Sequence, residues 1–190
     1  MPCSRALTIV LAACALAGCV DQPWHGIVMD PPAAAPPLSA TRADGATTTL
    51  ADAKGEVVAL YFGYTHCPDV CPTTMADWAR AKRALGADTV RVRFIFVSVD
   101  PGRDTPEIVQ AYARQFDAAF TGLVTTDAQL ALLRRDWGMP VYPEGDPRTR
   151  DYTVAHPAHT YVVDREGRTG LMIPPGTRGE EIAQDLRRLR

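Results

Sequence analysis

The 190-residue chain lacks an excess of charge of either sign, because 20 Lys and Arg residues stand against 22 Asp and Glu residues. The formal net charge of −2 provides no basic field to attract a phosphate backbone, so we expect no nucleic acid partner. Internal repeats are also absent, which argues against a repeat architecture. With 46% apolar and 22% charged residues, the composition is typical of one folded domain with an additional segment.

A long hydrophobic run is missing as well. Residues 6–17 are apolar and follow a single cationic side chain, Arg5, but this run is shorter than the roughly 20 residues that cross a bilayer. It has the length of a signal-peptide core and ends in Leu16-Ala17-Gly18-Cys19, which resembles the bacterial lipobox. We therefore expect a lipoprotein-type signal peptide over residues 1–18, lipid on Cys19, and a membrane-anchored domain on the outer, periplasmic side of the cytoplasmic membrane. The alternative is an ordinary signal peptide with a chance cysteine.

Cysteine is scarce once the signal peptide is removed. Of the five cysteines, Cys3 and Cys14 leave with the signal and Cys19 carries lipid, so only Cys67 and Cys71 remain as thiols. Two cysteines in an exported domain of this size do not form a disulfide framework. The pair must therefore serve each other or a ligand that they share.

Proline is concentrated after Cys19, and we assign residues 19–37 to a Pro/Ala-rich tether. A polyproline-like chain over residues 20–40 spans roughly 60 Å at about 3 Å per residue. Such a tether lets the domain that follows, residues 38–190, search for a neighbour.

That domain alternates between strand and helix patterns. Residues 57–62 form a continuous apolar run, which is typical of a strand buried on both faces. We predict a hairpin over 38–50, further strands near 90–99, 122–125, 160–163 and 169–173, helices over 72–85, 104–116, 126–137 and 178–190, and a long loop over 139–151. This order predicts an α/β fold, a thioredoxin-like three-layer sandwich with an N-terminal β-hairpin extension.

Cys67 lies in the loop that leaves the buried strand, and Cys71 lies at the first turn of the next helix. A helix N-terminus stabilises thiolate over thiol, and α/β sheets bind ligands at such strand-to-helix transitions. A structural disulfide across so short a loop stabilises little through chain entropy. A redox-active pair and a pair of metal ligands both remain open.

A metal needs more than two ligands, and His66, His156 and His159 are candidates. In a thioredoxin-like sheet the strand after His156 and His159 neighbours the strand before Cys67, so its entry loop approaches the sulfurs. Two thiolates and one imidazole suit copper, because sulfur favours Cu(I) and nitrogen helps to retain Cu(II). A structural zinc would need a fourth protein ligand that the sequence does not reveal.

Residues 63–72, Gly-Tyr-Thr-His-Cys-Pro-Asp-Val-Cys-Pro, resemble the signature of the Sco/SenC family of copper proteins. The likeness continues in residues 97–101, 104–106, 151–156 and 164–167. The resemblance implies a thioredoxin-like fold and one copper ion, Cu(I) or Cu(II), held by Cys67, Cys71 and His156. It also implies a role in assembling the binuclear copper centre of cytochrome oxidase. The partners would then be the copper-site subunit of the oxidase, a periplasmic copper donor and a thiol reductant.

Two departures from the family pattern concern the histidine. Pro157 follows His156 where the family more usually has a small hydroxyl residue, and His159 lies close enough to compete for the ion. We prefer His156 because its offset from Tyr161 matches the family pattern.

Under the copper hypothesis the protein is a carrier rather than an enzyme, so no catalytic residue is assigned beyond the redox-active pair Cys67 and Cys71. We expect this pair to form a reversible disulfide. The alternative function is a thiol–disulfide oxidoreductase without a copper-carrier role. A peroxidase is a third reading, because Val70-Cys71-Pro72-Thr73 resembles the peroxiredoxin loop.

Overall fold

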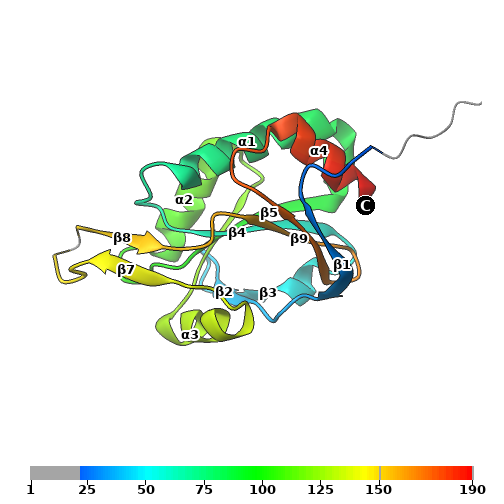
Figure 1. Ribbon diagram of the computed structural model, residues 1–190. Coiled ribbons are helices and arrows are strands. Elements are labelled where there is room, and N and C mark those ends of the chain that lie inside the picture. The colour runs from blue at the N-terminus through cyan, green and yellow to red at the C-terminus, as the bar shows by residue number, and fades with distance from the viewer. Residues whose placement is uncertain (1–21, 150, 190) are drawn as a thin grey trace, which may run out of the picture.

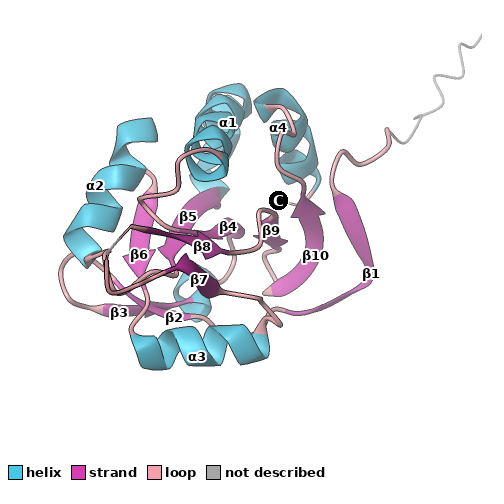
Figure 2. Ribbon diagram, turned by 60° about the vertical axis from the view of Figure 1, so that its left-hand side comes forward, coloured by secondary structure: helices cyan, strands magenta, loops and turns pink. Residues whose placement is uncertain are grey.

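The computed structural model describes residues 22–149 and 151–189. The expected signal peptide and the lipid-bearing Cys19 lie outside these residues. A sheet of eight strands, in the order β1-β10-β9-β4-β5-β6-β2-β3, forms the middle layer. Helices α1, α2 and α4 cover one face of the sheet and α3 covers the other (Figures 1 and 2). The three layers agree with the predicted sandwich.

The strands of this sheet are β1 (Ile27–Ala34), β2 (Ser39–Thr41), β3 (Thr47–Thr49), β4 (Val57–Gly63), β5 (Val92–Ser98), β6 (Thr121–Val124), β9 (Thr160–Val163) and β10 (Arg168–Ile173). A separate two-stranded sheet contains β7 (Tyr142–Gly145) and β8 (Tyr152–Ala155). The helices are α1 (Val70–Leu85), α2 (Pro106–Phe116), α3 (Asp127–Asp136) and α4 (Gly179–Arg188), with short 3-10 helices η1 (Leu50–Ala53) and η2 (Gly86–Arg91). Within the described residues, none of the helices combines the length and apolarity that a bilayer crossing requires.

Strand β4 divides the hydrophobic core in two, and all seven of its residues are buried. Alternate side chains of a strand point to opposite faces. Tyr61 accordingly enters the core beneath α1 with Trp78, whereas Phe62 enters the core that contains Leu130 of α3. The prediction of a strand buried on both faces is confirmed.

The two strands beside β4 determine which loops lie close to the end of β4. Strand β5 is parallel to β4, while β9 is antiparallel to it, with Leu60 opposite Tyr161. The predicted adjacency of the cysteine-bearing strand and the strand after the histidines is therefore confirmed. Both the end of β4 and the start of β9 lie at the same edge of the sheet.

The N-terminal segment differs from the tether expected over residues 19–37. Residues 27–34 form β1, an edge strand that pairs antiparallel with β10. The N–H groups of His25 and Gly26 donate to the buried Asp185 carboxylate of α4, at 3.1 and 2.8 Å. Two of the prolines that suggested a tether, Pro31 and Pro32, lie where the register of β1 shifts, and an edge strand tolerates them there.

The long loop expected over residues 139–151 also differs, because it contains β7. Strand β7 pairs with β8 from Tyr142 opposite Ala155 to Gly145 opposite Tyr152. The hairpin extends away from the main sheet beside the ends of β4 and β5 (Figure 1). The residues just before His156 therefore belong to a strand.

Candidate metal centre

Cys67 and Cys71 lie between the end of β4 and the first turn of α1. The helix begins at Val70, two residues before the predicted Pro72, so Cys71 is its second residue. Pro72 is still in the first turn, where the missing N–H has no partner within the helix in any case. Cys71 is fully buried and Cys67 is part-buried.

Gly63 makes room for the buried sulfur. A Cβ atom at this position would lie 2.8 Å from Sγ of Cys71 and 2.8 Å from Cε2 of Phe96. Real Cβ atoms essentially never approach other heavy atoms so closely. Glycine therefore allows Cys71 to pack directly against the end of β4.

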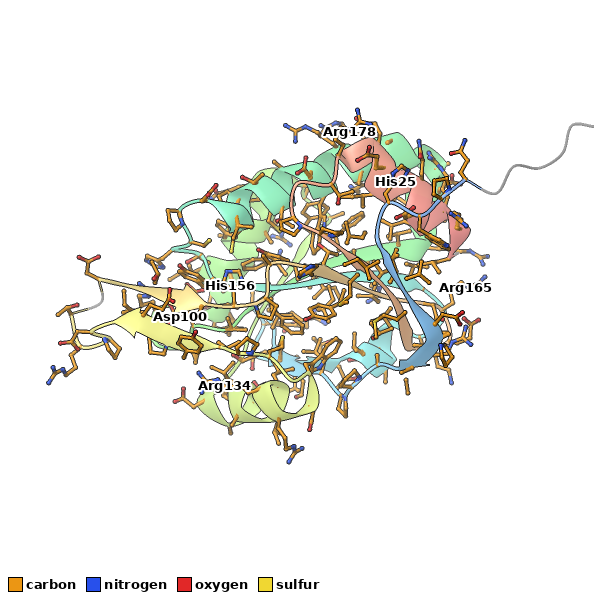
Figure 3. All side chains as sticks on the ribbon, in the orientation of Figure 1. His25, Asp100, Arg134, His156, Arg165 and Arg178 are labelled. Atoms are coloured by element: carbon orange, nitrogen blue, oxygen red, sulfur yellow. The ribbon has the colours of Figure 1, made fainter. Side chains whose placement is uncertain are left out.

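His156 lies in the connection between β8 and β9 (Figure 3). Its Nε2 lies 3.6 Å from Sγ of Cys71, and its Nδ1 lies 3.0 Å from the carbonyl oxygen of Pro157. When Nδ1 carries the proton and donates it to this carbonyl, the Nε2 lone pair faces the sulfur. Metal-bound histidines are generally oriented in this way by a contact on the second nitrogen.

Two tyrosines enclose the imidazole. The rings of Tyr61 and Tyr64 meet the His156 ring edge to face, with centroids 5.9 and 5.7 Å away. The Tyr61 hydroxyl also donates to Sγ of Cys71 at 3.8 Å. Burial, reinforced by the two cysteine sulfurs, raises the pKa of Tyr61, so this hydroxyl remains a donor.

The ligand atoms of Cys67, Cys71 and His156 all lie within 4.8 Å of one another. Among the described residues, these three make the one group of His, Cys, Asp or Glu side chains that is close enough to hold a metal ion. Bonds of about 2.0 Å to nitrogen and about 2.3 Å to sulfur let one ion reach all three donors after small side-chain movements. Two sulfurs and one nitrogen are a donor set that fits copper.

The remaining described histidines lie outside this group. His25 contacts Gln184 at 2.8 Å on α4. His66 is half exposed and lies 3.7 Å from the carboxylate of Asp104. His159, the expected competitor, does not join the group. The structure therefore brings together the two cysteines with His156, as the sequence analysis preferred.

The two thiols have opposite electrostatic environments. A hydrogen bond from Cys71, together with the N–H groups of Asp69 and Cys71, lowers the pKa of Cys67. The adjoining Cys67 thiolate and burial raise the pKa of Cys71. The sequence analysis placed Cys71 at the helix N-terminus, yet the start of α1 stabilises the thiolate of Cys67. Both cysteines are free in this structure, so their disulfide stays a prediction.

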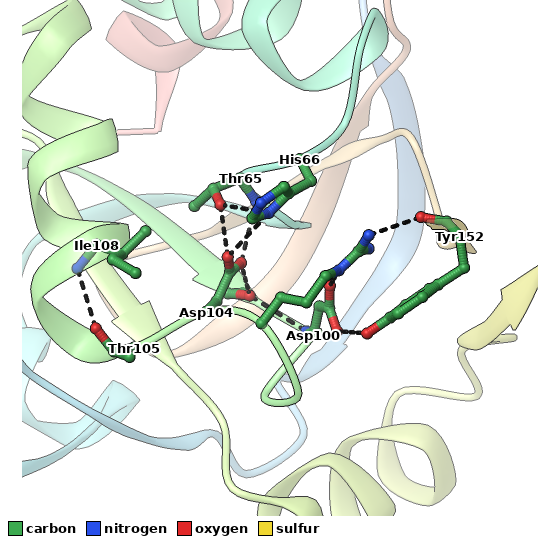
Figure 4. Close-up of polar contacts among 9 residues, drawn as sticks. Thr65, His66, Asp100, Asp104, Thr105, Ile108 and Tyr152 are labelled. Carbon is green, nitrogen blue, oxygen red and sulfur yellow. Dashed lines mark hydrogen bonds and ion pairs between the residues drawn. The ribbon is translucent and has the colours of Figure 1, made fainter. Parts of the chain in front are cut away.

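Asp104 holds the cysteine loop in place. Its fully buried carboxylate accepts bonds from the N–H of Thr65 at 3.0 Å, from the hydroxyl of Thr65 at 2.5 Å and from the hydroxyl of Ser98 (Figure 4). The sequence analysis read the segment from Asp104 as a helix start. The cap of α2 is Thr105, whose hydroxyl accepts from the N–H of Ile108 at 3.4 Å. Sequence reasoning missed the role of Asp104 beside the site.

Comparisons with known proteins agree with this geometry. Residues 29–190 match a family model described as SCO1/SenC. Protein SCO1 homolog 1, mitochondrial, of Arabidopsis thaliana is 34% identical over 134 residues, which cover 68% of this chain and 39% of that protein. The first curated relatives that the chain matches are longer proteins, of which it spans between 39% and 57%.

Solved structures are similar over a larger share of their chains. The solution structure of apo Sco1 from Thermus thermophilus has a TM-score of 0.81 and 32% identity, covering 90% of this chain and 99% of that chain. The structure of Bradyrhizobium japonicum ScoI with copper bound has a TM-score of 0.75 and 36% identity, covering 83% of this chain and 100% of that chain. The expected thioredoxin-like sandwich is confirmed.

Proposed function

The chain belongs to the SCO1/SenC family, and from this premise we propose that it is a copper-binding assembly factor for cytochrome c oxidase. It delivers copper to the binuclear copper site of the oxidase, or prepares the thiols of that site. The observation that carries the proposal is the cluster of two sulfurs and one imidazole nitrogen within 4.8 Å. The similar B. japonicum ScoI has been described with copper bound.

Cys67, Cys71 and His156 are the proposed ligands of one copper ion per chain. Two thiolates favour the soft Cu(I) ion, and the imidazole adds the nitrogen that helps to retain Cu(II). Cys67 already favours the thiolate form, so binding has to displace one proton, that of Cys71. The contact between Nδ1 of His156 and Pro157 supports the histidine assignment, because it points Nε2 at Cys71.

The exposure of the ligands supports delivery rather than permanent storage. Cys71 is buried, whereas Cys67 and His156 are only part-buried. Thiolates of a partner can therefore replace Cys67 and His156 first, and the copper ion keeps at least one ligand throughout. The partners that we propose are the copper-site subunit of the oxidase, a periplasmic copper donor and a thiol reductant.

One observation also supports the second candidate, a thiol–disulfide oxidoreductase. A part-exposed thiolate on Cys67 beside a buried thiol on Cys71 is suited to attack a disulfide and then resolve the mixed disulfide. His156 is not needed for that chemistry. Its position 3.6 Å from Cys71 therefore favours the copper function.

We propose further that the mature protein starts at a lipid-bearing Cys19 and that its domain faces the periplasm. The apolar run over residues 6–17 and the sequence before Cys19 support this. Mass spectrometry of the native protein is expected to find a diacylated N-terminal Cys19. A mature chain that begins elsewhere and partitions into water contradicts the anchor.

Metal titration of the soluble domain tests the copper function. We expect one copper ion per chain, and Cys67→Ser or Cys71→Ser is expected to abolish tight binding of both Cu(I) and Cu(II). His156→Ala is expected to keep much of the Cu(I) affinity, measured against a competing chelator, and to lose the Cu(II) spectrum. His159→Ala is the matched control and is expected to behave as the wild type.

A wild-type domain that binds no copper but reduces disulfide substrates supports the oxidoreductase instead. If His159→Ala loses Cu(II) and His156→Ala does not, the histidine assignment is wrong.

A further inference from the structure

The connection between β5 and α2 contains a buried ion pair. Nε of Arg103 lies 2.6 Å from Oδ2 of Asp100, and the two side chains are only 4% and 5% exposed. Removing one partner of such a pair is strongly destabilising, because the other charge is left uncompensated. The pair lies beside the proposed copper site, in a motif to which the copper function gives no role.

Arg103 and Asp100 together hold the first residue of β8, Tyr152. The Arg103 guanidinium donates to the carbonyl oxygen of Tyr152 at 2.8 Å and lies 3.6 Å from the centre of its ring. The hydroxyl of Tyr152 donates to Oδ1 of Asp100 at 2.6 Å. Figure 4 shows the bonds made by Tyr152, one of them to Asp100.

Strand β8 delivers His156 to the site, because His156 follows Ala155, the last residue of β8. The hairpin of β7 and β8 forms its own sheet and is not hydrogen-bonded into the main one. Side chains must therefore attach it to the domain. The Arg103 contacts at Tyr152 and the buried side chain of Val154 provide that attachment.

A second contact leads from Arg103 toward the imidazole. The guanidinium carbon lies 5.5 Å from the centre of the Tyr64 ring. Tyr64 in turn packs edge to face on His156, with centroids 5.7 Å apart. Arg103 thus contacts both the strand that carries His156 and the ring that supports it.

The next residue, Asp104, holds the cysteine loop through Thr65. One short connection therefore contacts both the cysteine loop, at Thr65, and the strand that precedes His156, at Tyr152. Different side chains make the two attachments: Arg103 bonds Tyr152, and Asp104 bonds Thr65. Loosening Arg103 is expected to free the histidine arm and to leave the cysteine loop in place.

We propose that Arg103 is a positioning residue for His156, and that it decides whether the imidazole joins the two sulfurs. This inference rests on the proposed copper function of the site. With Arg103 in place, the site offers nitrogen and sulfur and retains Cu(II). Without its planar contacts the site keeps the two thiolates for Cu(I) and binds Cu(II) less tightly.

Arg103→Lys tests this inference, because lysine keeps the charge beside Asp100 but loses the planar fork and the stacking on Tyr152. Tyr152→Phe is a second variant that keeps the ring and removes only the bond to Asp100. Arg93→Lys is the matched control: Arg93 makes a two-bond pair with Glu56, and it lies opposite Val58 at the other end of β5.

Cu(II) affinity is expected to fall about 10- to 100-fold in Arg103→Lys, as for other residues that orient metal ligands. Cu(I) affinity is expected to remain at the wild-type value. NMR of the metal-free protein should show shifted His156 ring resonances in Arg103→Lys and unshifted ones in Arg93→Lys. Tyr152→Phe is expected to change the same quantities in the same direction, by a smaller factor.

The outcomes distinguish a failure of the copper function from a failure of the positioning role of Arg103. A wild-type domain that binds no copper refutes the proposed function, while the His156 resonances of the metal-free variants still test the positioning role. Equal Cu(II) affinity in Arg103→Lys and Arg93→Lys, or equal losses of Cu(I) and Cu(II), overturns the inference. If Arg103→Lys does not fold, wild-type Cu(II) affinity and His156 resonances in Tyr152→Phe overturn it.

Discussion

Asp104→Asn is the substitution whose effect on stability follows most directly from the structure. The Asp104 carboxylate is fully buried and accepts three hydrogen bonds, two from Thr65 and one from Ser98. Asparagine has nearly the same shape but carries no charge, and it replaces one acceptor oxygen by a donor NH2 group.

The magnitude can be worked out bond by bond. Hydrogen bonds to a charged group contribute about 1.5–3 kcal/mol each and neutral ones about 0.5–1.5 kcal/mol, so each bond loses about 1 kcal/mol. Three bonds give a loss of about 3 kcal/mol, and the lower cost of burying a neutral side chain reduces this to about 2–3 kcal/mol. For a domain of this size the melting temperature is then expected to fall by about 5–10 °C.

Urea unfolding of the soluble domain, followed by circular dichroism, measures the free energy of unfolding by linear extrapolation. Asp136→Asn is the control, because Asp136 pairs on the surface of α3 with Arg135, whose side chain is 70% exposed. It is expected to unfold as the wild type does. A change in Asp104→Asn of less than about 0.5 kcal/mol, the range of ordinary surface substitutions, refutes the reasoning.

Three further predictions concern the two cysteines and their packing. Oxidation by a small-molecule disulfide is expected to link Cys67 to Cys71 and to block copper binding, because disulfide sulfur lacks the thiolate charge. In a redox titration, copper uptake that is the same at every potential contradicts this prediction. Alkylation of Cys67 by iodoacetamide should keep its rate as the pH falls from about 9 to about 7, because its lowered pKa keeps the thiolate where an ordinary thiol near 8.5 is protonated. A tenfold drop in the alkylation rate per pH unit below about 8.5 would rule out the lowered pKa. Gly63→Ala should cost about 1–3 kcal/mol by overpacking against Cys71 and weaken Cu(I) binding, and wild-type stability and affinity would show that the sulfur has room to move.

Local signals in the sequence predicted most of the main sheet and its helices. The apolar run of β4, the Thr105-Pro106 start of α2 and the Thr126-Asp127 start of α3 depend on neighbouring residues alone. Strands β1 and β7 were not predicted because their pairing is non-local. β1 contains two prolines and is stabilised by the open edge of β10, while β7 contains Pro143 and is stabilised by β8.

The residues of the site also differ in whether local sequence or tertiary structure reveals them. The spacing of Cys67 and Cys71 marks them in the sequence, whereas His156 required the order of strands in the fold and a resemblance to known proteins. Asp104 and Gly63 were missed because their importance arises from tertiary contacts, a buried carboxylate beside one loop and a missing Cβ beside one sulfur. The sequence signal available for Asp104 was its position shortly after the buried strand β5.

The attachment of the N-terminal segment to α4 limits how far the domain can move from the proposed lipid on Cys19. Trp24 lies against Arg188, with the guanidinium carbon 3.6 Å from the centre of the indole, and the next two residues are bonded to Asp185. If Cys19 carries lipid, the segment from Cys19 to Trp24 is 24 − 19 = 5 residues long and spans at most about 18 Å. If the domain can move only about 18 Å from the lipid on Cys19, and not roughly 60 Å, the volume accessible to it is about 40-fold smaller. The effective concentration of the domain toward a neighbour within reach rises by the same factor. The docking site of a neighbour must then lie within this reach plus the width of the domain itself.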